Sequence, residues 1–234
     1  MKKILLFIAL SVYLVSPTIG QSKQKELKTI FSAEINYLMF LPKEYSEKGV
    51  PSPMIIFLHG SGERGNNLEK VKAWGPPAIV EKNPDFPFVV VSPQCPEDEY
   101  WNVFLLKKMI DDVLQNYNID KSRVYLTGLS MGGYGAWELA INYPNYFAAI
   151  APICGGGNPA FVSQLKDIPV WVFHGKKDDA VPEQQSAEMV EALKKIGANV
   201  EYTILPEGRH VDTWVYAYGE AGLFDWFLKH TKKQ

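Results

Sequence analysis

Short apolar segments alternate along this chain with longer segments in which apolar residues recur at helical spacing. Most of the short segments close on glycine or proline, and several are apolar on both faces. Such segments are typical of strands buried in a parallel sheet. The expected strands are residues 34–41, 54–58, 88–92, 123–127, 148–153, 170–173 and 200–205.

The longer segments predict helices. Residues 104–117 carry apolar side chains on one helical stripe, and residues 184–196 do the same before a stop signal at Gly197. Further helices are expected over residues 134–143 and 214–230. Strands and helices that alternate in this way predict an open, doubly wound α/β sheet. Ligands of such sheets bind beyond the carboxyl ends of the strands, which is where every glycine-rich motif of this chain falls.

The first residues have a different pattern. Lys2 and Lys3 precede an apolar run over residues 4–15, and small residues follow up to Gly20. This order predicts a secretory signal peptide over residues 1–20, followed by a single domain over residues 21–234. An uncleaved membrane anchor is the alternative, but the run is shorter than the roughly 20 residues that span a bilayer. We therefore expect a secreted or periplasmic protein with no membrane association after cleavage.

Composition narrows the classes further. Hydrophobic residues make up 47% and charged residues 21% of the 234 residues, which is a globular balance. The formal net charge is −2 and no basic stripe occurs, so nucleic acid is not an expected partner. Four histidines and two cysteines form no cluster at metal-ligand spacing, so neither a metal nor another cofactor is expected. Whether Cys95 and Cys154 pair in an exported protein is left open, as is the oligomeric state.

One turn carries a candidate nucleophile. Ser130 lies in the pattern Gly-x-Ser-x-Gly, with Gly128 and Gly132 on either side, after a buried strand and before a helix. A strand that turns directly into a helix strains its middle residue and leaves no room for side chains two residues away. The serine hydroxyl is then exposed beside the N-terminal N–H groups of the helix, which favour negative charge. The alternative is a glycine-rich turn that only packs.

A serine hydroxyl needs a base, and that base needs an orienting carboxylate. His210 follows the last predicted strand and is the expected base; His174 is the second candidate, although it and His59 are expected to brace turns, and His230 to be solvated. The acid is expected between nucleophile and base in chain order. Asp178 is preferred, Asp179 is the alternative, and Asp212 is too close to the base in sequence.

Acyl transfer passes through a tetrahedral intermediate with a negatively charged oxygen, and two N–H donors are needed to stabilise this oxyanion. The residue after the nucleophile, Met131, should supply one of them. The loop after an earlier strand should supply the other, from Ser61 or, as second choice, Gly62. In the same loop we expect Glu63 and Arg64 to form an ion pair that stiffens the loop, in preference to a role in substrate binding. The loop lacks the Gly-Lys-Ser/Thr signature of a nucleotide-binding loop.

These motifs together resemble the α/β-hydrolase esterases. They are His59-Gly-Ser-Gly-Glu-Arg-Gly65, Ser92-Pro-Gln-Cys-Pro96, Gly128-Leu-Ser-Met-Gly-Gly-Tyr-Gly-Ala-Trp137, Pro152-Ile-Cys-Gly-Gly-Gly157, His174-Gly-Lys-Lys-Asp-Asp-Ala-Val-Pro182, and His210 with Trp214. The most similar group is the exported phospholipase/carboxylesterase-like proteins, which are related to feruloyl and acetylxylan esterases of carbohydrate esterase family one. The match runs in order from about residue 34 to the C-terminus.

The resemblance implies a three-layer α/β-hydrolase fold, with Ser130, Asp178 and His210 as catalytic triad and Ser61 and Met131 as oxyanion donors. Dienelactone hydrolases and prolyl oligopeptidase-type peptidases share the motifs, but the former carry a cysteine nucleophile where this chain has Ser130. The segment over residues 155–167 is too short for a large lid, so an open cleft is expected. Trp101, Tyr134 and Trp214 are candidate walls for the substrate.

The expected activity is hydrolysis of carboxylic esters with short-chain, acetyl or feruloyl acyl groups. The expected partner is a small-molecule ester or one linked to plant polysaccharide. Two alternatives remain open: a serine peptidase acting on small peptides, and a non-catalytic carbohydrate-binding protein that kept the fold.

Overall fold

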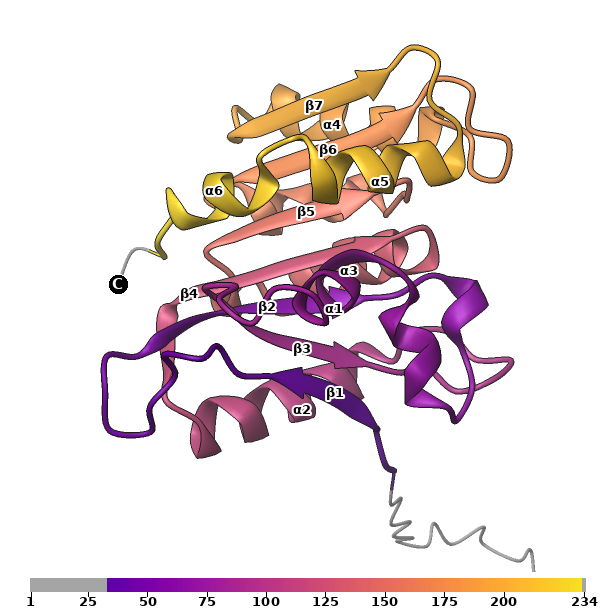
Figure 1. Cartoon of the computed structure of the whole chain (residues 1–234). Coiled ribbons are helices and arrows are strands. Elements are labelled where there is room, and N and C mark those ends of the chain that lie inside the picture. Colours follow the sequence, from indigo (N-terminus) through magenta and orange to yellow (C-terminus); the bar gives the residue numbers. More distant parts are fainter. Residues whose placement is uncertain (1–32, 233–234) are drawn as a thin grey trace, which may run out of the picture. The chain divides into compact units, whose positions relative to one another are not determined.

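A seven-stranded sheet forms the centre of the chain in a computed structural model that describes residues 33–232 (Figure 1). Its order is β1-β3-β2-β4-β5-β6-β7, and every neighbouring pair is parallel except β1 with β3. The strands are β1 (Tyr37–Phe40), β2 (Ser52–Leu58), β3 (Val89–Pro93), β4 (Ile119–Leu129), β5 (Ala149–Ile153), β6 (Val170–Gly175) and β7 (Val200–Leu205).

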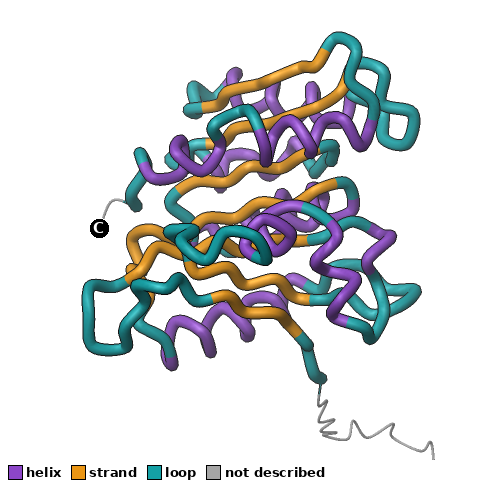
Figure 2. Tube along the Cα trace, in the orientation of Figure 1, coloured by secondary structure: helices purple, strands orange, loops and turns teal. Residues whose placement is uncertain are grey.

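Helices cover both faces of the sheet, which makes three layers (Figure 2). The α-helices are α1 (Gly75–Val80), α2 (Val103–Asn116), α3 (Met131–Asn142), α4 (Gln184–Lys195), α5 (His210–Gly219) and α6 (Leu223–Leu228). Within residues 33–232, four 3₁₀ helices lie in the connections: η1 (Ser61–Glu63), η2 (Leu68–Ala73), η3 (Pro144–Tyr146) and η4 (Pro159–Leu165). The α/β sheet that alternation predicts is therefore present.

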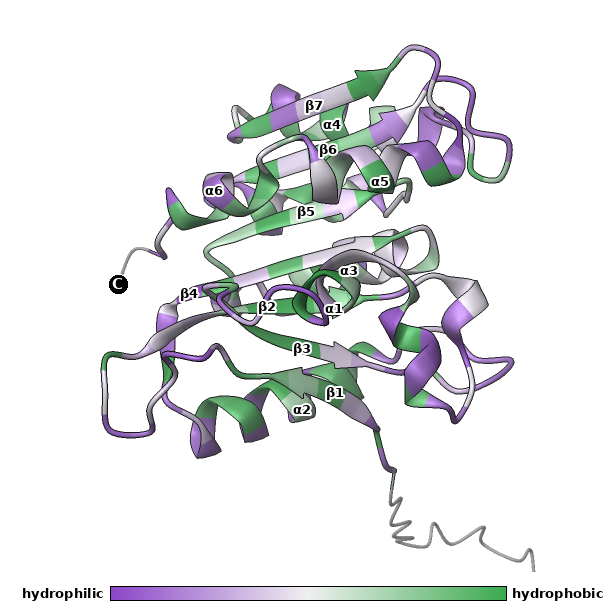
Figure 3. Cartoon of the chain, in the orientation of Figure 1, coloured by the Kyte–Doolittle hydropathy of each residue, from purple (hydrophilic) through white to green (hydrophobic). Residues whose placement is uncertain are grey.

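Two hydrophobic cores lie on opposite faces of the sheet, because successive strand side chains point to opposite sides. In β2, Met54, Ile56 and Leu58 belong to the core that also contains side chains of α2, α3 and α4, whereas Ile55 and Phe57 belong to the core that contains side chains of α5 and α6. Much of β2, β3 and β5 is hydrophobic, whereas the helices carry both hydrophobic and hydrophilic residues (Figure 3). Burial on both faces explains why the strands read as continuous apolar runs.

The last predicted helix differs from the structure. Residues 214–230 were expected to form one segment, but two helices occur, α5 and α6. Gly222 separates them with a φ of 74°. This left-handed conformation suits glycine and breaks the helical path. α5 also begins at His210 itself, which was expected in a loop.

His230 is half-buried rather than solvated. Its ring packs against Trp226 with 4.5 Å between ring centroids, and its Nε2 is shielded from solvent. An apolar neighbour one helical turn away on α6 covers the ring, which composition near the C-terminus did not indicate.

Among residues 33–232, no helix combines the length and the apolarity that a membrane span requires. The predicted signal peptide, residues 1–20, lies outside the described residues and stays a prediction.

Candidate active site

Ser130 occupies the tight turn between β4 and α3, with φ 54° and ψ −119°. A non-glycine residue in this region is strained and is held there by its surroundings. The two flanking glycines show why. A Cβ atom on Gly128 would lie 2.2 Å from the carbonyl oxygen of Gly132, and one on Gly132 would lie 1.9 Å from the carbonyl oxygen of Leu58. Only glycine fits at either position, so the turn projects Ser130 at the carboxyl edge of the sheet.

A hydrogen-bonded chain joins the three expected triad residues. Ser130 Oγ lies 2.8 Å from His210 Nε2, and His210 Nδ1 lies 2.6 Å from Asp178 Oδ2. The network is satisfied when Nδ1–H donates to the carboxylate and Nε2 accepts from the serine hydroxyl. The imidazole is then in the tautomer that can remove the serine proton. The carboxyl ends of β4 and β6 and the start of α5 supply these residues, which lie far apart in sequence.

The Asp178 carboxylate is fully buried and held on several sides. Its Oδ1 accepts hydrogen bonds from the N–H groups of Ala180 (2.9 Å) and Val181 (2.8 Å). These bonds and the one from His210 hold the pKa of Asp178 below its usual range, although burial alone would raise it. Asp178 therefore stays ionised beside the imidazole.

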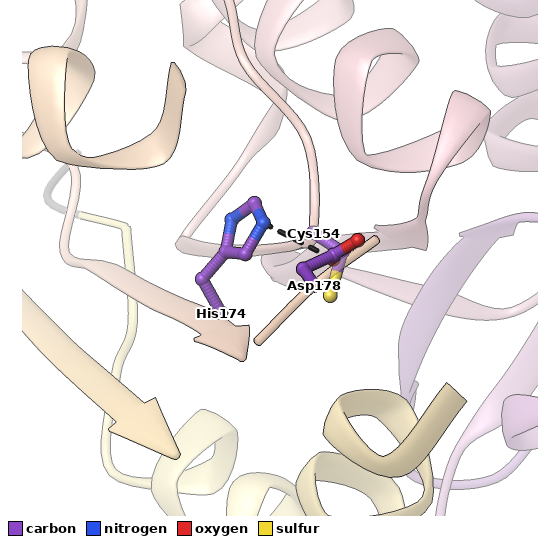
Figure 4. Close-up of side chains that lie close together, drawn as sticks. All are labelled: Cys154, His174 and Asp178. Atoms are coloured by element: carbon purple, nitrogen blue, oxygen red, sulfur yellow. Dashed lines mark ion pairs between the residues drawn. The ribbon is translucent and has the colours of Figure 1, made fainter. Parts of the chain in front are cut away.

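A second histidine lies against the same carboxylate. His174 Nε2 is 3.2 Å from Asp178 Oδ2 (Figure 4). The same Nε2 is 3.0 Å from the carbonyl oxygen of Val181, and Nδ1 is 2.7 Å from Ser186 Oγ. Burial lowers the pKa of His174, so it is neutral near pH 7. The predicted bracing role of His174 thus extends to Asp178, a contact that its place in the sequence did not reveal.

The same neighbourhood holds the one group of potential metal ligands that residues 33–232 contain: Cys154, His174 and Asp178, with ligand atoms within 4.8 Å of one another. Each ligand atom already has protein partners. Burial strongly raises the pKa of the Cys154 thiol, whereas metal ions bind the thiolate. The side chains therefore suit a packed, hydrogen-bonded surround for Asp178 better than a metal centre.

Asp179, the alternative acid, and Asp212, which was judged too close to the base in sequence, both lie away from His210 Nδ1. The side chain of Asp179 is 57% exposed and pairs with Arg209 at 2.8 Å. Asp212 accepts a hydrogen bond from the N–H of Arg209 at the start of α5. The adjacent residues Asp178 and Asp179 thus point in different directions: the carboxylate of Asp178 is buried at the end of β6, and that of Asp179 faces solvent.

A cleft of about 410 Å³ opens beside the nucleophile. Ser61, Arg64, Tyr100, Ser130, Met131 and Tyr134 line it. Met131 is the first residue of α3 and Ser61 is the first residue of η1, so neither N–H has an acceptor within its own helix. The structure thus brings both expected oxyanion donors to the cleft that contains Ser130.

The aromatic candidates are placed differently from one another. Tyr134 lines the cleft. Trp214 is 6% exposed and packs edge-on against His210 at 4.9 Å between ring centroids. Trp101 is 7% exposed, packs against His59, and is not among the residues that line the cleft. Tyr100, which we did not single out from the sequence, is 79% exposed at the rim.

The prediction of an ion pair between Glu63 and Arg64 is wrong. No ion pair among residues 33–232 includes Arg64. Its Nε donates to the carbonyl of Ser61 (3.1 Å) and its Nη1 donates to the carbonyl of Glu99 (3.2 Å). Side chains adjacent in sequence diverge here, because Glu63 turns back over Gly60.

Cys95 and Cys154 are both buried and unbonded. Cys95 follows β3 and donates its N–H to His59, whereas Cys154 follows β5 near the triad. The possible disulfide is therefore absent from the structure.

His59 makes the stability of the fold depend on pH. Its Nε2 accepts the N–H of Cys95 (3.0 Å) and its Nδ1 donates to the carbonyl of Gly60 (2.6 Å), so a second ring proton would face another N–H group. Burial lowers the pKa of His59 from 6.5 to about 4. The unfolded chain therefore takes up this proton first as the pH falls. The stability that neutral His59 contributes is present above its unfolded pKa of 6.5 and is lost as the pH drops toward 4.

We expect His59 to account for about 2 kcal/mol of lost unfolding free energy between pH 7.5 and about 5. Urea unfolding of wild type and His59→Gln at both pH values measures this, because glutamine keeps an acceptor but does not titrate. His174 and His230, whose pKa values are also lowered, remain in both proteins and cancel in the comparison. An equal pH dependence in the two proteins would contradict the assignment.

Comparison with known proteins identifies the family. The Esterase family model matches residues 29–216. A thermostable esterase of known structure is 34% identical, with a TM-score of 0.75 over 86% of this chain and 60% of that one. The feruloyl esterase module from Clostridium thermocellum has a TM-score of 0.59 at 16% identity, which shows a shared fold. The expected α/β-hydrolase fold is confirmed, and the chain belongs to the Esterase family.

Two curated relatives match part of the chain. The bifunctional acetylxylan esterase/xylanase XynS20E of Neocallimastix patriciarum is 33% identical over 146 residues, which are 57% of this chain and 20% of that protein. Poly(3-hydroxyalkanoate) depolymerase C of Paucimonas lemoignei is 32% identical over 127 residues, 46% of this chain and 29% of that protein. The matched segment therefore covers less than a third of the length of either relative.

Proposed function

We propose that the protein is a serine esterase that hydrolyses carboxylic esters through an acyl-enzyme. The observation that carries this proposal is the continuous hydrogen-bonded chain from Ser130 through His210 to Asp178. Membership of the Esterase family supports ester hydrolysis as the reaction.

In the first half-reaction, Ser130 Oγ attacks the acyl carbonyl carbon while His210 Nε2 takes the serine proton. Buried and ionised, Asp178 stabilises the imidazolium that forms. The N–H groups of Ser61 and Met131 stabilise the oxyanion, a contribution worth about 10²- to 10³-fold in rate for one donor. His210 then protonates the leaving alcohol as the carbon–oxygen bond breaks.

Water completes the cycle. His210 removes a proton from a water molecule that attacks the acyl-serine, and the same oxyanion donors stabilise the second tetrahedral species. Collapse of that species returns the proton to Ser130 and releases the carboxylic acid. Tyr100, which lines the cleft beside Ser130, is largely exposed to solvent, so the cleft opens to the surface and water can enter after the alcohol leaves.

We propose short-chain, acetyl or feruloyl esters as substrates, including esters on plant polysaccharide. The connection between β5 and β6 holds only the short η4, so it leaves the cleft uncovered for an ester attached to a bulky polymer. Tyr134 would form a wall of the cleft, while Trp101 and Trp214 would support it through His59 and His210. The proposed signal peptide over residues 1–20 would deliver the domain of residues 21–234 to the periplasm or the exterior.

An ester panel tests this function. We expect p-nitrophenyl acetate and butyrate, methyl ferulate and acetylated xylan to be hydrolysed, and p-nitrophenyl palmitate to react at least tenfold more slowly, because a cleft of about 410 Å³ holds little of a long chain. A dipeptide p-nitroanilide in the same panel distinguishes a peptidase. Faster cleavage of the anilide than of every ester would overturn the proposal, and so would absence of labelling by a fluorophosphonate probe.

A further inference from the structure

Arg64 is a charged side chain in the cleft that the proposed mechanism does not use. It lines the cleft together with Ser130, and the other residues that line it are uncharged. The chain has three arginines, all of them among the described residues. Arg123 pairs with Asp120 at 2.6 Å and Arg209 pairs with Asp179 at 2.8 Å, whereas Arg64 has no carboxylate within 4.0 Å in the described part of the chain.

The guanidinium is held in place without a counter-charge. Its bonds to the carbonyls of Ser61 and Glu99 use two of the five N–H donors of an arginine. Half-burial of Arg64 further limits its movement. A donor group ordered in this way loses little conformational entropy when it binds a ligand.

The surrounding charges do not neutralise it. Glu63 turns back over Gly60, and the Glu97 carboxylate lies over Gly65, next to Lys70. Lys70 Nζ donates to the carbonyl oxygen of Arg64 at 3.1 Å, so the nearest charged group bonded to this residue is a second cation and not a carboxylate. Glu99 offers Arg64 its backbone carbonyl.

We propose that Arg64 binds a carboxylate on the substrate, so that the preferred ester carries a negative charge close to the scissile bond. A planar guanidinium with free N–H groups matches a carboxylate in geometry and charge. This inference rests on the proposed esterase function and specifies its substrate class. The carboxylate can belong to the alcohol part or to the acyl part of the ester, and the test separates these two cases.

Two pairs of esters of matched size provide that test. 4-Acetoxybenzoate and 4-acetoxybenzamide differ by a charge on the alcohol part; monophenyl adipate and the phenyl ester of adipamic acid differ by a charge on the acyl part. We expect the charged member of one pair to have a kcat/KM about tenfold above its neutral partner at low ionic strength. High salt should reduce this ratio without changing the neutral reaction to the same extent.

The variants are compared by the same ratio, so that a general loss of activity does not affect the reading. Arg64→Gln should lower the ratio to about one, and Arg64→Lys should keep most of it. Lys43→Gln is the matched control. It removes one exposed cation just beyond the end of β1, which is antiparallel, so it lies at the opposite edge of the sheet from Ser130 and should leave the ratio unchanged.

The outcomes are distinct. A ratio near one in both pairs for the wild type overturns the carboxylate site even if Arg64→Gln fails to fold, and an unchanged ratio in Arg64→Gln overturns it as well. In both cases ester hydrolysis itself stands. If none of the four esters is hydrolysed, the proposed function fails, and the carboxylate site fails with it.

Discussion

Ser130→Ala is expected to lower kcat for p-nitrophenyl acetate by about 10⁶-fold, since removal of a nucleophile removes the acyl-enzyme route. Ser130 Oγ is the atom that His210 Nε2 contacts at 2.8 Å, and alanine has no group in its place. Residual hydrolysis would come from the oxyanion donors and from substrate binding. Stopped assays with purified protein measure the loss, and far-UV circular dichroism establishes that the fold persists.

Ser163→Ala is the matched control for this change. Ser163 is exposed on η4, so its hydroxyl can be removed without effect on the cleft or the core. Wild-type rates are expected for Ser163→Ala, together with full labelling by a fluorophosphonate probe. Retention of more than about a hundredth of the activity in Ser130→Ala would exclude Ser130 as nucleophile, because no known background route is that efficient.

Asp178→Asn is expected to lower kcat by about 10⁴-fold, the second largest effect. An asparagine oxygen can still accept the N–H groups of Ala180 and Val181, and its amide N–H then faces His210 Nδ1. Nδ1 must accept rather than donate, which puts the ring proton on Nε2, where it blocks removal of the serine proton. Because the loop keeps the hydrogen bonds from Ala180 and Val181, and His174 Nε2 keeps the carbonyl oxygen of Val181 as its partner, the loss should appear in kcat with little change in KM.

Asp179→Asn separates the two adjacent aspartates. Its carboxylate is more than half exposed and pairs with Arg209 on the surface. Exposed pairs of this kind contribute about 0–1 kcal/mol, so activity should change less than about threefold. If Asp179→Asn were the more damaging substitution, the roles assigned to the two residues would have to be exchanged.

The predictability of the site differed from residue to residue. The position of Ser130 could be predicted because its signal is local: a strand, two obligatory glycines and a helix lie within a few residues of it. The choice of Asp178 over Asp179 could only be ranked, because neighbouring carboxylates differ in burial and not in chemistry. The pairing of Arg64 was predicted wrongly, since two residues adjacent in a loop need not face each other.

Packing explains the remaining differences. Trp101 and Trp214 were expected to line the cleft, but each is buried and packs edge-on against a histidine: Trp101 against His59, and Trp214 against His210 one turn earlier on α5. The second contact of Asp178, with His174, depends on how the loop after β6 folds back onto its own strand. Such contacts depend on backbone direction in three dimensions, which hydrophobic periodicity does not record.

Periodicity, chain order and the glycine turn were sufficient to establish the layered α/β architecture and the edge of the sheet where chemistry would be sought. They suffice because each reflects an interaction over a few residues: alternate burial, helical spacing, or a turn too tight for a Cβ atom. Folding alone settled which acid meets His210, that the two thiols stay apart, and that Arg64 lies in the cleft without a counter-charge. Each of those outcomes depends on segments that are remote in sequence and meet only when the sheet assembles.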